Sequence, residues 1–134
     1  MPEATTLEAL KEAYRKDRFA TEACHCRIVE ASPDRVVCEM DIEPVHLNAN
    51  GVVMGGATFT LADFALAVAC NLQNPPSVTL SSEIRYLGVA KGSKLLATAS
   101  VDKSGRRTGF FTIEVTDELG TKVAKVSSTT FHVG

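Results

Sequence analysis

One stretch of the chain decides the fold: residues 55–71 read GGATFTLADFALAVACN. Apolar side chains occupy every side of its helical wheel, and Asp63 is the only charged residue in it. A helix that is apolar on all sides must be enclosed by other structure. The stretch therefore predicts a buried central helix that begins at the glycine pair Gly55-Gly56.

The segments on both sides of this helix alternate apolar and polar residues in the manner of β-strands. Before the helix, residues 23–42 predict a hairpin with its turn at Ser32-Pro33-Asp34. After it come four predicted strands, at 78–87, 95–103, 109–117 and 122–133. Because the connections are short, we expect consecutive strands to pair antiparallel. The result is an α+β fold in which an antiparallel β-sheet is wrapped around a long central α-helix.

The chain of 134 residues fits one domain, 1–134, with an N-terminal helical extension at 1–19 and the core at 20–134. Within the extension, Thr5 and Glu8 have the spacing of a helix capping box. Leu7, Leu10 and Tyr14 then follow at helical spacing. This predicts a short amphipathic helix.

Composition excludes several kinds of partner. The chain has 14 basic and 16 acidic residues without a basic cluster, which argues against nucleic acid. Residues 1–17 mix both charges and lack the apolar run of a signal peptide, so we expect a cytoplasmic protein. The longest apolar stretch, 52–72, contains Asp63 and lacks flanking basic anchors, so we expect a core helix and no membrane association.

Four cysteines, Cys24, Cys26, Cys38 and Cys70, are present without a CxxC pair, and we expect them to be reduced and buried. The run Cys24-His25-Cys26 could suggest a metal site. In a strand, however, His25 would point away from both cysteines, so one ion could not collect all three side chains. We expect no metal.

Asp63 is the first candidate for chemistry. It has no opposite charge among its neighbours on the helix, so a group outside the helix must satisfy its carboxylate. One interpretation is structural, with backbone amides or a basic residue of the sheet as the partner. The other is functional, because desolvation raises the pKa of a carboxylate and so favours its action as a general base near neutral pH.

The helix entrance supplies the complementary group. An unpaired backbone amide at Gly55 or Gly56, at the positive end of the helix dipole, can act as an oxyanion donor. The alternative is that the glycines serve only close packing. Gly55 and Asp63 are separated by about 12 Å along one helix, too far to act on one atom. Two antiparallel copies would bring Gly55 of one copy to Asp63 of the other, which predicts a homodimer or a dimer of dimers.

A family resemblance rests on these same residues. Residues 46–56, HLNANGVVMGG, followed by TLAD at 60–63, resemble the phenylacetate-pathway type of acyl-CoA thioesterase. The resemblance extends over roughly residues 20–134, through IRYL at 84–87 and FHVG at 131–134. It implies the hotdog fold and hydrolysis of an acyl-CoA or aryl-CoA substrate to free CoA and carboxylate. It also implies no cofactor beyond the coenzyme A of the substrate.

The resemblance also implies roles for individual residues. Asp63 would be the general base or nucleophile, the amide of Gly55 would polarise the thioester carbonyl, and Asn48 would orient water or substrate. A hydroxyl on the strand after the helix often assists in this family. Thr79 or Ser81, which we expect to share a strand face, would supply it.

Substrate binding would involve Met54 and Gly56 at the helix entrance, and Ser81 on the strand. Most family members have a histidine immediately before the two glycines, where this chain has Met54, and a thioether cannot donate a hydrogen bond. His46 could replace that histidine, but a surface or hinge position is the more ordinary interpretation of a loop residue.

For the phosphates of CoA, the turn residues Arg106 and Arg107 are candidates, although surface charge is their ordinary role. Two other functions remain open on the same fold. Met54 is compatible with a non-catalytic acyl-CoA binding or sensing protein. A hydratase or dehydratase would need a histidine and carboxylate pair, and no histidine stands at the helix entrance.

Overall fold

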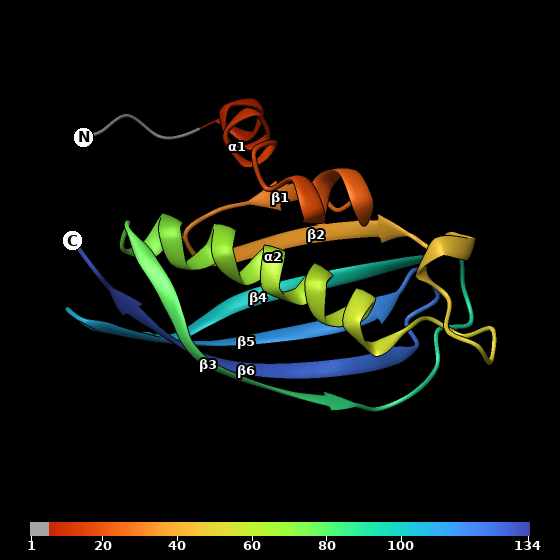
Figure 1. Cartoon of the computed structure of the whole chain (residues 1–134). Coiled ribbons are helices and arrows are strands. Elements are labelled where there is room, and N and C mark those ends of the chain that lie inside the picture. Colours follow the sequence, from red (N-terminus) through yellow and green to blue (C-terminus); the bar gives the residue numbers. More distant parts are fainter. Residues whose placement is uncertain (1–5) are drawn as a thin grey trace.

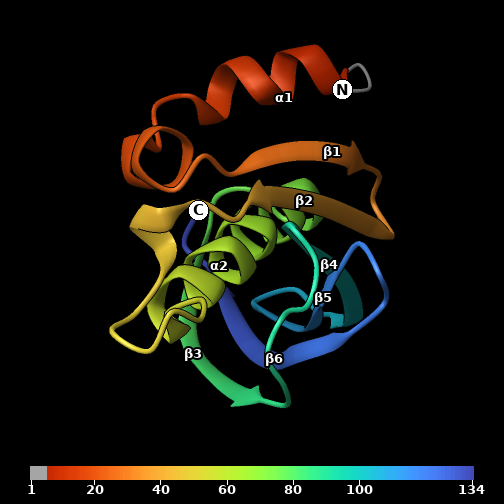
Figure 2. The ribbon, with the colours of Figure 1, turned by 90° about the vertical axis from the view of Figure 1, so that its right-hand side faces the viewer.

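The structure, a computed structural model, describes residues 6–134. One six-stranded sheet curves around a single long helix, α2, which spans Gly55–Gln73 (Figure 1). The strand order is β1-β2-β4-β5-β6-β3, and every pair is antiparallel. Viewed from the end, α2 lies in the hollow of the sheet and α1 lies outside β1 (Figure 2). The predicted α+β architecture is confirmed.

The strands are β1 (Arg27–Ala31), β2 (Arg35–Asp41), β3 (Ser77–Tyr86), β4 (Lys94–Ser104), β5 (Thr108–Asp117) and β6 (Lys122–His132). The shorter helical elements are α1 (Leu7–Tyr14), the π-helical turn η1 (Phe19–Ala23) and the 3-10 turn η2 (Pro44–His46). The predicted ends of the central helix and of the last four strands differ from these by only one or two residues, which is the usual uncertainty of such boundaries.

The core lies between α2 and the concave face of the sheet. Leu61 and Leu66 of α2 and Met40 and Ile113 of the sheet are almost fully buried. Each such side chain stabilises the fold by roughly 1.5–3 kcal/mol relative to an exposed position. α2 is long and apolar enough to cross a membrane by length and composition, but 56% of its most apolar window is buried inside the fold. It is the core helix that the sequence predicts.

The predicted pairing of consecutive strands is wrong for β3. β3 pairs with β6, and β4 pairs with β2 and β5, so β3 forms an edge of the sheet. The connection at 87–93 must cross roughly three strand spacings, about 14 Å. An extended chain of that length reaches about 23 Å, so a turn-like connection does not force its two strands to be neighbours.

The segment before β1 also differs from the prediction. Residues 23–26 are not part of a strand: η1 ends at Ala23, His25 has a φ of 58°, and β1 begins only at Arg27. His25 is exposed, with Nδ1 3.0 Å from a carboxylate oxygen of Glu43. Among residues 6–134 no group of three His, Cys, Asp or Glu residues could hold a metal ion.

All four cysteines are unpaired and buried, as predicted. Burial, with a smaller effect from neighbouring Cys24, raises the pKa of Cys26 to about 12. Burial likewise raises the pKa of Cys70 to about 11. Thiols with such pKa values carry almost no thiolate at neutral pH and are chemically inert.

The N-terminal extension packs on α2. The Thr6 side chain caps α1 by accepting the N–H of Ala9 at 3.0 Å, whereas Thr5, the predicted cap, lies outside the described residues. The Tyr14 hydroxyl donates to the carbonyl oxygen of Ala67 at 3.2 Å, and its ring packs edge-on against Phe64. The chain that follows α1 is thereby held beside the middle of α2.

Candidate functional site

The start of α2 leaves two backbone amides available. Met54 occupies the N-cap position, and its thioether makes no capping hydrogen bond. The N–H groups of Ala57 and Thr58 both bond the carbonyl oxygen of Met54. Within the described part of the chain, the N–H groups of Gly55 and Gly56 have no hydrogen-bond acceptor. Two such amides at the positive end of a helix can hold an oxyanion.

The loop before α2 fixes this entrance. The carbonyl oxygen of His46 accepts the N–H of Met54 at 2.8 Å. The side-chain oxygen of Asn48 accepts the N–H groups of Asn50 and Val52 at 2.9 and 3.3 Å. Asn48 therefore shapes the loop with its oxygen, and only its exposed NH₂ group is available for a substrate or a water molecule.

Tyr86, the last residue of β3, covers the entrance from the sheet side. Its hydroxyl donates to the carbonyl oxygen of Gly55 at 2.9 Å. A Cβ atom on residue 55 would lie only 2.9 Å from that hydroxyl oxygen, so the close approach favours glycine there. The contact joins residues that are 31 positions apart, and no local sequence pattern could have predicted it.

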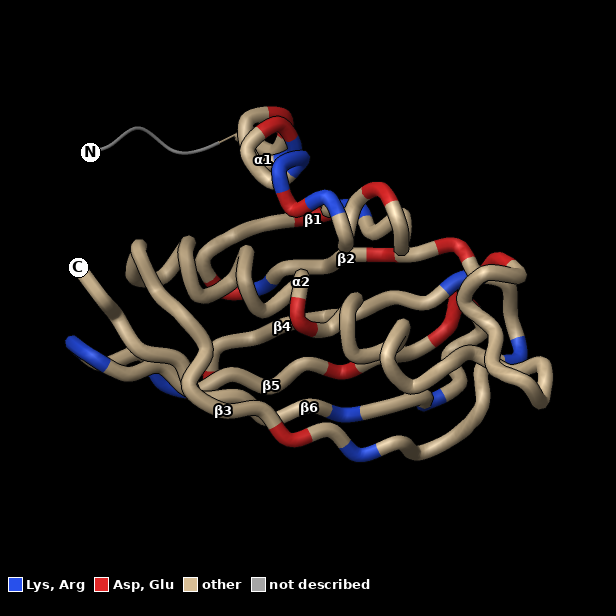
Figure 3. The backbone as a smooth tube through the Cα atoms, in the orientation of Figure 1, with Lys and Arg blue, Asp and Glu red and all other residues tan. Residues whose placement is uncertain are grey.

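Asp63 lies about two turns further along α2. Its side chain is exposed in the single chain, so the predicted enclosure of α2 on all sides is wrong at this face. Gly56 and Asp63 are exposed, and Thr60 and Ala67 are half-buried. Because their spacing places all four on one side of the helix, they form one partly uncovered stripe. Figure 3 shows α2 with a single acidic position on an otherwise uncharged helix.

Asp63 opens into a cleft of about 470 Å³ between α2 and the segment after α1, whose walls include Asp17, Phe19 and Phe59. Contact with these apolar walls raises the pKa of Asp63, and the negative charge of Asp17 raises it further. Among residues 6–134, no ion pair or side-chain hydrogen bond involves Asp63. Within the described chain, the carboxylate therefore lacks the partner that a purely structural role would require.

Thr79 and Ser81 do not share a strand face, contrary to the prediction. A β-bulge at residue 80 places Thr79 opposite Thr130 and Ser81 opposite Thr129, and these two partners point to opposite faces. Thr130 is buried on the helix side, so Thr79 faces the helix side and Ser81 faces outward. Ser82 takes the inner position instead, with its Oγ 2.7 Å from Oγ of Ser128.

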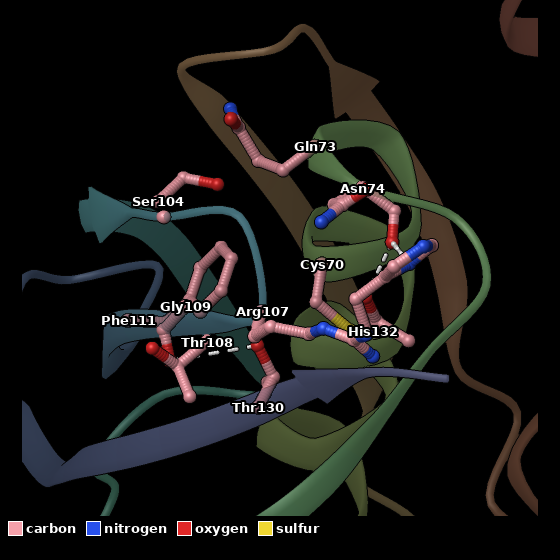
Figure 4. Close-up of a pocket in the computed structure, with 12 residues that line it drawn as sticks. Cys70, Gln73, Asn74, Ser104, Arg107, Thr108, Gly109, Phe111, Thr130 and His132 are labelled. Carbon is pink, nitrogen blue, oxygen red and sulfur yellow. Dashed lines mark hydrogen bonds between the residues drawn. The ribbon is translucent and has the colours of Figure 1, made fainter. Parts of the chain in front are cut away.

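Arg106 and Arg107 lie in the turn between β4 and β5, beside the C-terminal end of α2. Asn74, which follows α2, donates its side-chain NH₂ to the carbonyl oxygen of Arg106 at 3.0 Å. This end is about 27 Å from the glycine entrance along the helix. The adjacent cavity in Figure 4 measures about 10 Å³, room for one water molecule at most. The structure does not bring these arginines to the glycine entrance of the same chain.

A long helix with unpaired glycine amides, held in the hollow of an antiparallel sheet, defines a protein of the hotdog class. The sequence profile of the thioesterase superfamily matches residues 50–124. Human acyl-coenzyme A thioesterase 13 is 32% identical over 130 residues, covering 95% of this chain and 93% of that protein. The acyl-coenzyme A thioesterase PaaI of Escherichia coli is 32% identical over 123 residues, covering 90% of this chain and 86% of its own. The chain therefore belongs to the thioesterase superfamily.

Solved structures agree with this assignment. The PaaI protein from the phenylacetic acid degradation operon of E. coli superposes with a TM-score of 0.85 at 28% identity, covering 92% of this chain and 90% of that chain. A hypothetical thioesterase from Streptococcus pneumoniae, solved with coenzyme A, superposes with a TM-score of 0.82 at 26% identity, covering 90% of this chain and 97% of its own. The predicted hotdog fold is confirmed.

Proposed function

We propose that the protein is an acyl-CoA thioesterase that hydrolyses an acyl-CoA or aryl-CoA thioester to free CoA and a carboxylate. One observation carries the proposal: the unpaired amides of Gly55 and Gly56 and the unpaired carboxylate of Asp63 lie on the same helix, with no other charge on it. Membership of the thioesterase superfamily supports the reaction type, and the acyl-CoA thioesterases among its relatives support the substrate class.

The chemistry follows from these groups. The N–H of Gly55 donates to the carbonyl oxygen of the thioester, which makes the carbonyl carbon more electrophilic. Asp63 takes a proton from a water molecule, and the oxygen of that water attacks the carbon. The C–S bond then breaks, and the sulfur of CoA leaves and takes up the proton. Direct attack by the Asp63 carboxylate is the alternative route to the same products.

The two groups must come from different copies of the chain. They are separated by about 12 Å on one helix, which is too far for both to reach one carbonyl group. The uncovered stripe of α2 consists of small residues around Asp63, and small residues let a second helix approach closely. Two antiparallel copies of α2 would place Gly55 of one copy beside Asp63 of the other. We therefore propose a homodimer, or a dimer of dimers, with two equivalent sites in each pair.

The edge of the sheet supports this assembly. β3 is a long edge strand whose outer backbone groups lack a strand partner in the described chain, and Val78 and Leu80 on it are 48% and 59% exposed. A long apolar edge strand is a template for pairing with another chain. Joining two β3 edges would extend the sheet and place both α2 helices on its same side.

We further propose that the enzyme is cytoplasmic and uses no cofactor beyond the CoA of its substrate, without nucleic-acid or membrane partners. The proposed reaction needs only a carboxylate, a water molecule and a backbone amide. Cell fractionation tests the location. If the enzyme uses no metal cofactor, exhaustive chelation should leave the rate of thiol release unchanged.

Thiol release from a panel of acyl-CoA and aryl-CoA thioesters tests the proposed activity. We expect release by the parent protein and a loss of roughly 10²–10⁴-fold in Asp63→Asn. Glu114→Gln removes the same charge from an exposed position of β5 and should retain the parent rate. An Asp63→Asn protein as fast as the parent would exclude Asp63 from catalysis. Tight binding in calorimetry without turnover of any thioester would favour the non-catalytic alternative.

A further inference from the structure

The cleft around Asp63 has two walls, and only one of them belongs to α2. Each residue that lines it comes either from positions 59–67 of α2 or from positions 17–20 of the N-terminal extension. Within the described chain, no residue of the sheet lines it. The part of the extension at residues 15–23, called the strap from here on, therefore converts an open face of α2 into a cleft.

The strap has little hold of its own on α2. Its hydrogen bonds and ion pairs, such as that of Arg18 with Glu22 at 2.9 Å, stay within residues 12–26. Among the described residues, none of these bonds joins the strap to α2. Ala20 is the buried side chain of the turn η1, whereas Phe19 is 69% exposed. A residue outside the strap must therefore hold it in place.

Tyr14, which directly precedes the strap, provides this anchor. Its hydroxyl donates to the carbonyl oxygen of Ala67 at 3.2 Å, and its ring meets that of Phe64 edge-on with the centroids 5.9 Å apart. Both of these α2 residues line the cleft themselves. The N–H of Asp17 bonds the carbonyl oxygen of Tyr14 at 3.0 Å. The first residue of the strap wall is thus tied to the anchor.

We infer that Tyr14 is a positioning residue for Asp63: it holds the strap against α2 and so forms the cleft in which the carboxylate acts. The inference rests on the proposed thioesterase function, in which Asp63 takes a proton from water. It adds the group that prepares Asp63 for that step. Tyr14 need not contact the substrate, because it acts through residues 17–20.

The strap affects Asp63 in two ways. Its apolar side chains displace water from the carboxylate, and Asp17 brings a negative charge near it; both effects raise the pKa of Asp63. Arg18 also faces the cleft but is paired with Glu22, and the Cys70 thiol of α2 is neutral because burial raises its pKa to about 11. A strap that leaves α2 would weaken both effects, so the pKa of Asp63 would fall toward the ordinary aspartate value of about 3.9.

A titration of Asp63 followed by carboxyl-carbon NMR tests the inference, with its signal assigned by its absence in Asp63→Asn. Tyr14→Ala removes both the hydroxyl and the ring that hold the strap. We expect the Asp63 titration and the acid limb of the pH–rate profile for thiol release to move together to lower pH. Tyr14→Phe keeps the ring contact and should shift both less. Burial raises the pKa of Tyr14 to about 12, so its own ionisation lies outside this pH range.

A double variant distinguishes positioning from a general loss of stability. Asp17→Asn alone removes the charge that the strap brings to Asp63, so it should also move the titration to lower pH. In the Tyr14→Ala background the strap no longer holds residue 17 there, so the same substitution should have a smaller effect. Val37→Ala is the matched control: it removes buried volume from β2 outside the cleft and should leave the titration of Asp63 unchanged.

Thermal melting checks that each variant is folded. If Tyr14→Ala is not, Tyr14→Leu takes its place in the same comparison, because it keeps a large apolar side chain but loses the hydroxyl and the ring. Two results would overturn the inference. One is an unchanged Asp63 titration in the folded variant, and the other is an effect of Asp17→Asn that is equally large with and without Tyr14.

The NMR titration needs no turnover, so its outcome is separate from the proposed activity. A parent protein that releases no thiol, together with a shifted titration in Tyr14→Ala, would refute the thioesterase and leave Tyr14 as the anchor of the Asp63 cleft. Thiol release by the parent together with an unmoved titration would refute only the role of Tyr14.

Discussion

Tyr86 donates its hydroxyl hydrogen to the carbonyl oxygen of Gly55 over 2.9 Å, and so ties the end of the edge strand β3 to the first turn of α2. The neighbouring amide of Gly55 is the proposed oxyanion donor. The hydrogen bond therefore joins the end of β3 to the residue whose amide is proposed to hold the reacting carbonyl.

Removal of this hydroxyl should have a small effect. Tyr86→Phe keeps the ring against the helix and loses one hydrogen bond of an exposed side chain, with a net value of about 1 kcal/mol or less. We expect at most a severalfold decrease in kcat and little change in KM, measured by thiol release. A loss as large as that in Asp63→Asn would instead indicate that the hydroxyl contacts the reacting atoms.

Removal of the Gly55 amide hydrogen should have a large effect. Gly55→Pro deletes the N–H, and proline is tolerated at the first position of a helix when an extended residue such as Met54 precedes it. We expect a roughly 10²–10³-fold lower kcat. Gly55→Ala is the matched control, because it adds the same Cβ beside Tyr86 but keeps the amide. Equal rates in the two variants would show that the amide is not the donor.

The acid side of the pH–rate profile should respond to Asp17. The proposed reaction needs Asp63 in its ionised form. Its pKa is raised above the ordinary aspartate value of about 3.9, so activity should fall as the pH decreases through that raised pKa. Asp17→Asn removes the negative charge that adds to this shift, which lowers the pKa of Asp63. We expect the acid limb to move to lower pH. Arg18 also faces the cleft, but its guanidinium is paired with Glu22 at 2.9 Å. An unmoved acid limb would refute this role of Asp17.

Asp117 should be a determinant of stability. Its carboxylate accepts the backbone N–H groups of Lys91, Gly92, Leu119 and Thr121 at 2.8–3.0 Å, which holds the 87–93 connection against the end of β5. Burial alone would raise its pKa, but these donors outweigh burial and hold the pKa well below the usual range.

The pH dependence of this effect has a definite sign. Because the folded-state pKa of Asp117 is depressed, its contribution is present above the ordinary value of about 3.9 and is lost as the pH falls below it. Asp117→Asn should therefore have a lower Tm than the parent at pH 7, and the difference should shrink in acid. Thermal melts at several pH values measure this, and a difference that grows in acid would contradict it.

Local sequence patterns sufficed for much of this fold. The apolar run at 55–71 predicts a central helix because only an enclosed helix tolerates such a composition, and the alternating runs after it predict the strands. The candidate residues Asp63 and Gly55 follow from charge and helix position. Within the described residues, the carboxylate of Asp63 has no hydrogen-bond partner and the N–H of Gly55 has no acceptor, so the expected partner of Asp63 is not found there.

The remaining features depend on geometry that local patterns do not encode. The bulge at residue 80 inserts one residue into β3. As a result Ser81 faces outward and Ser82 faces the helix, the reverse of what a regular strand would give. The crossing of residues 87–93 places β3 at the edge of the sheet, which depends on the whole sheet rather than on the length of the connection. His46 is buried in the turn η2, where its Nδ1 accepts the backbone N–H of Glu43, and no loop composition predicts that burial.

Mixing two inactive variants tests the shared site most directly. Asp63→Asn keeps the amide of Gly55, and Gly55→Pro keeps Asp63, so a mixed dimer contains one site with both groups intact. After subunit exchange at equal concentrations, half of the dimers are mixed and each has one working site, so thiol release should rise to about a quarter of the parent rate. If the mixture released thiol no faster than the average of the two separate variants, the site would not be formed between two copies of the chain.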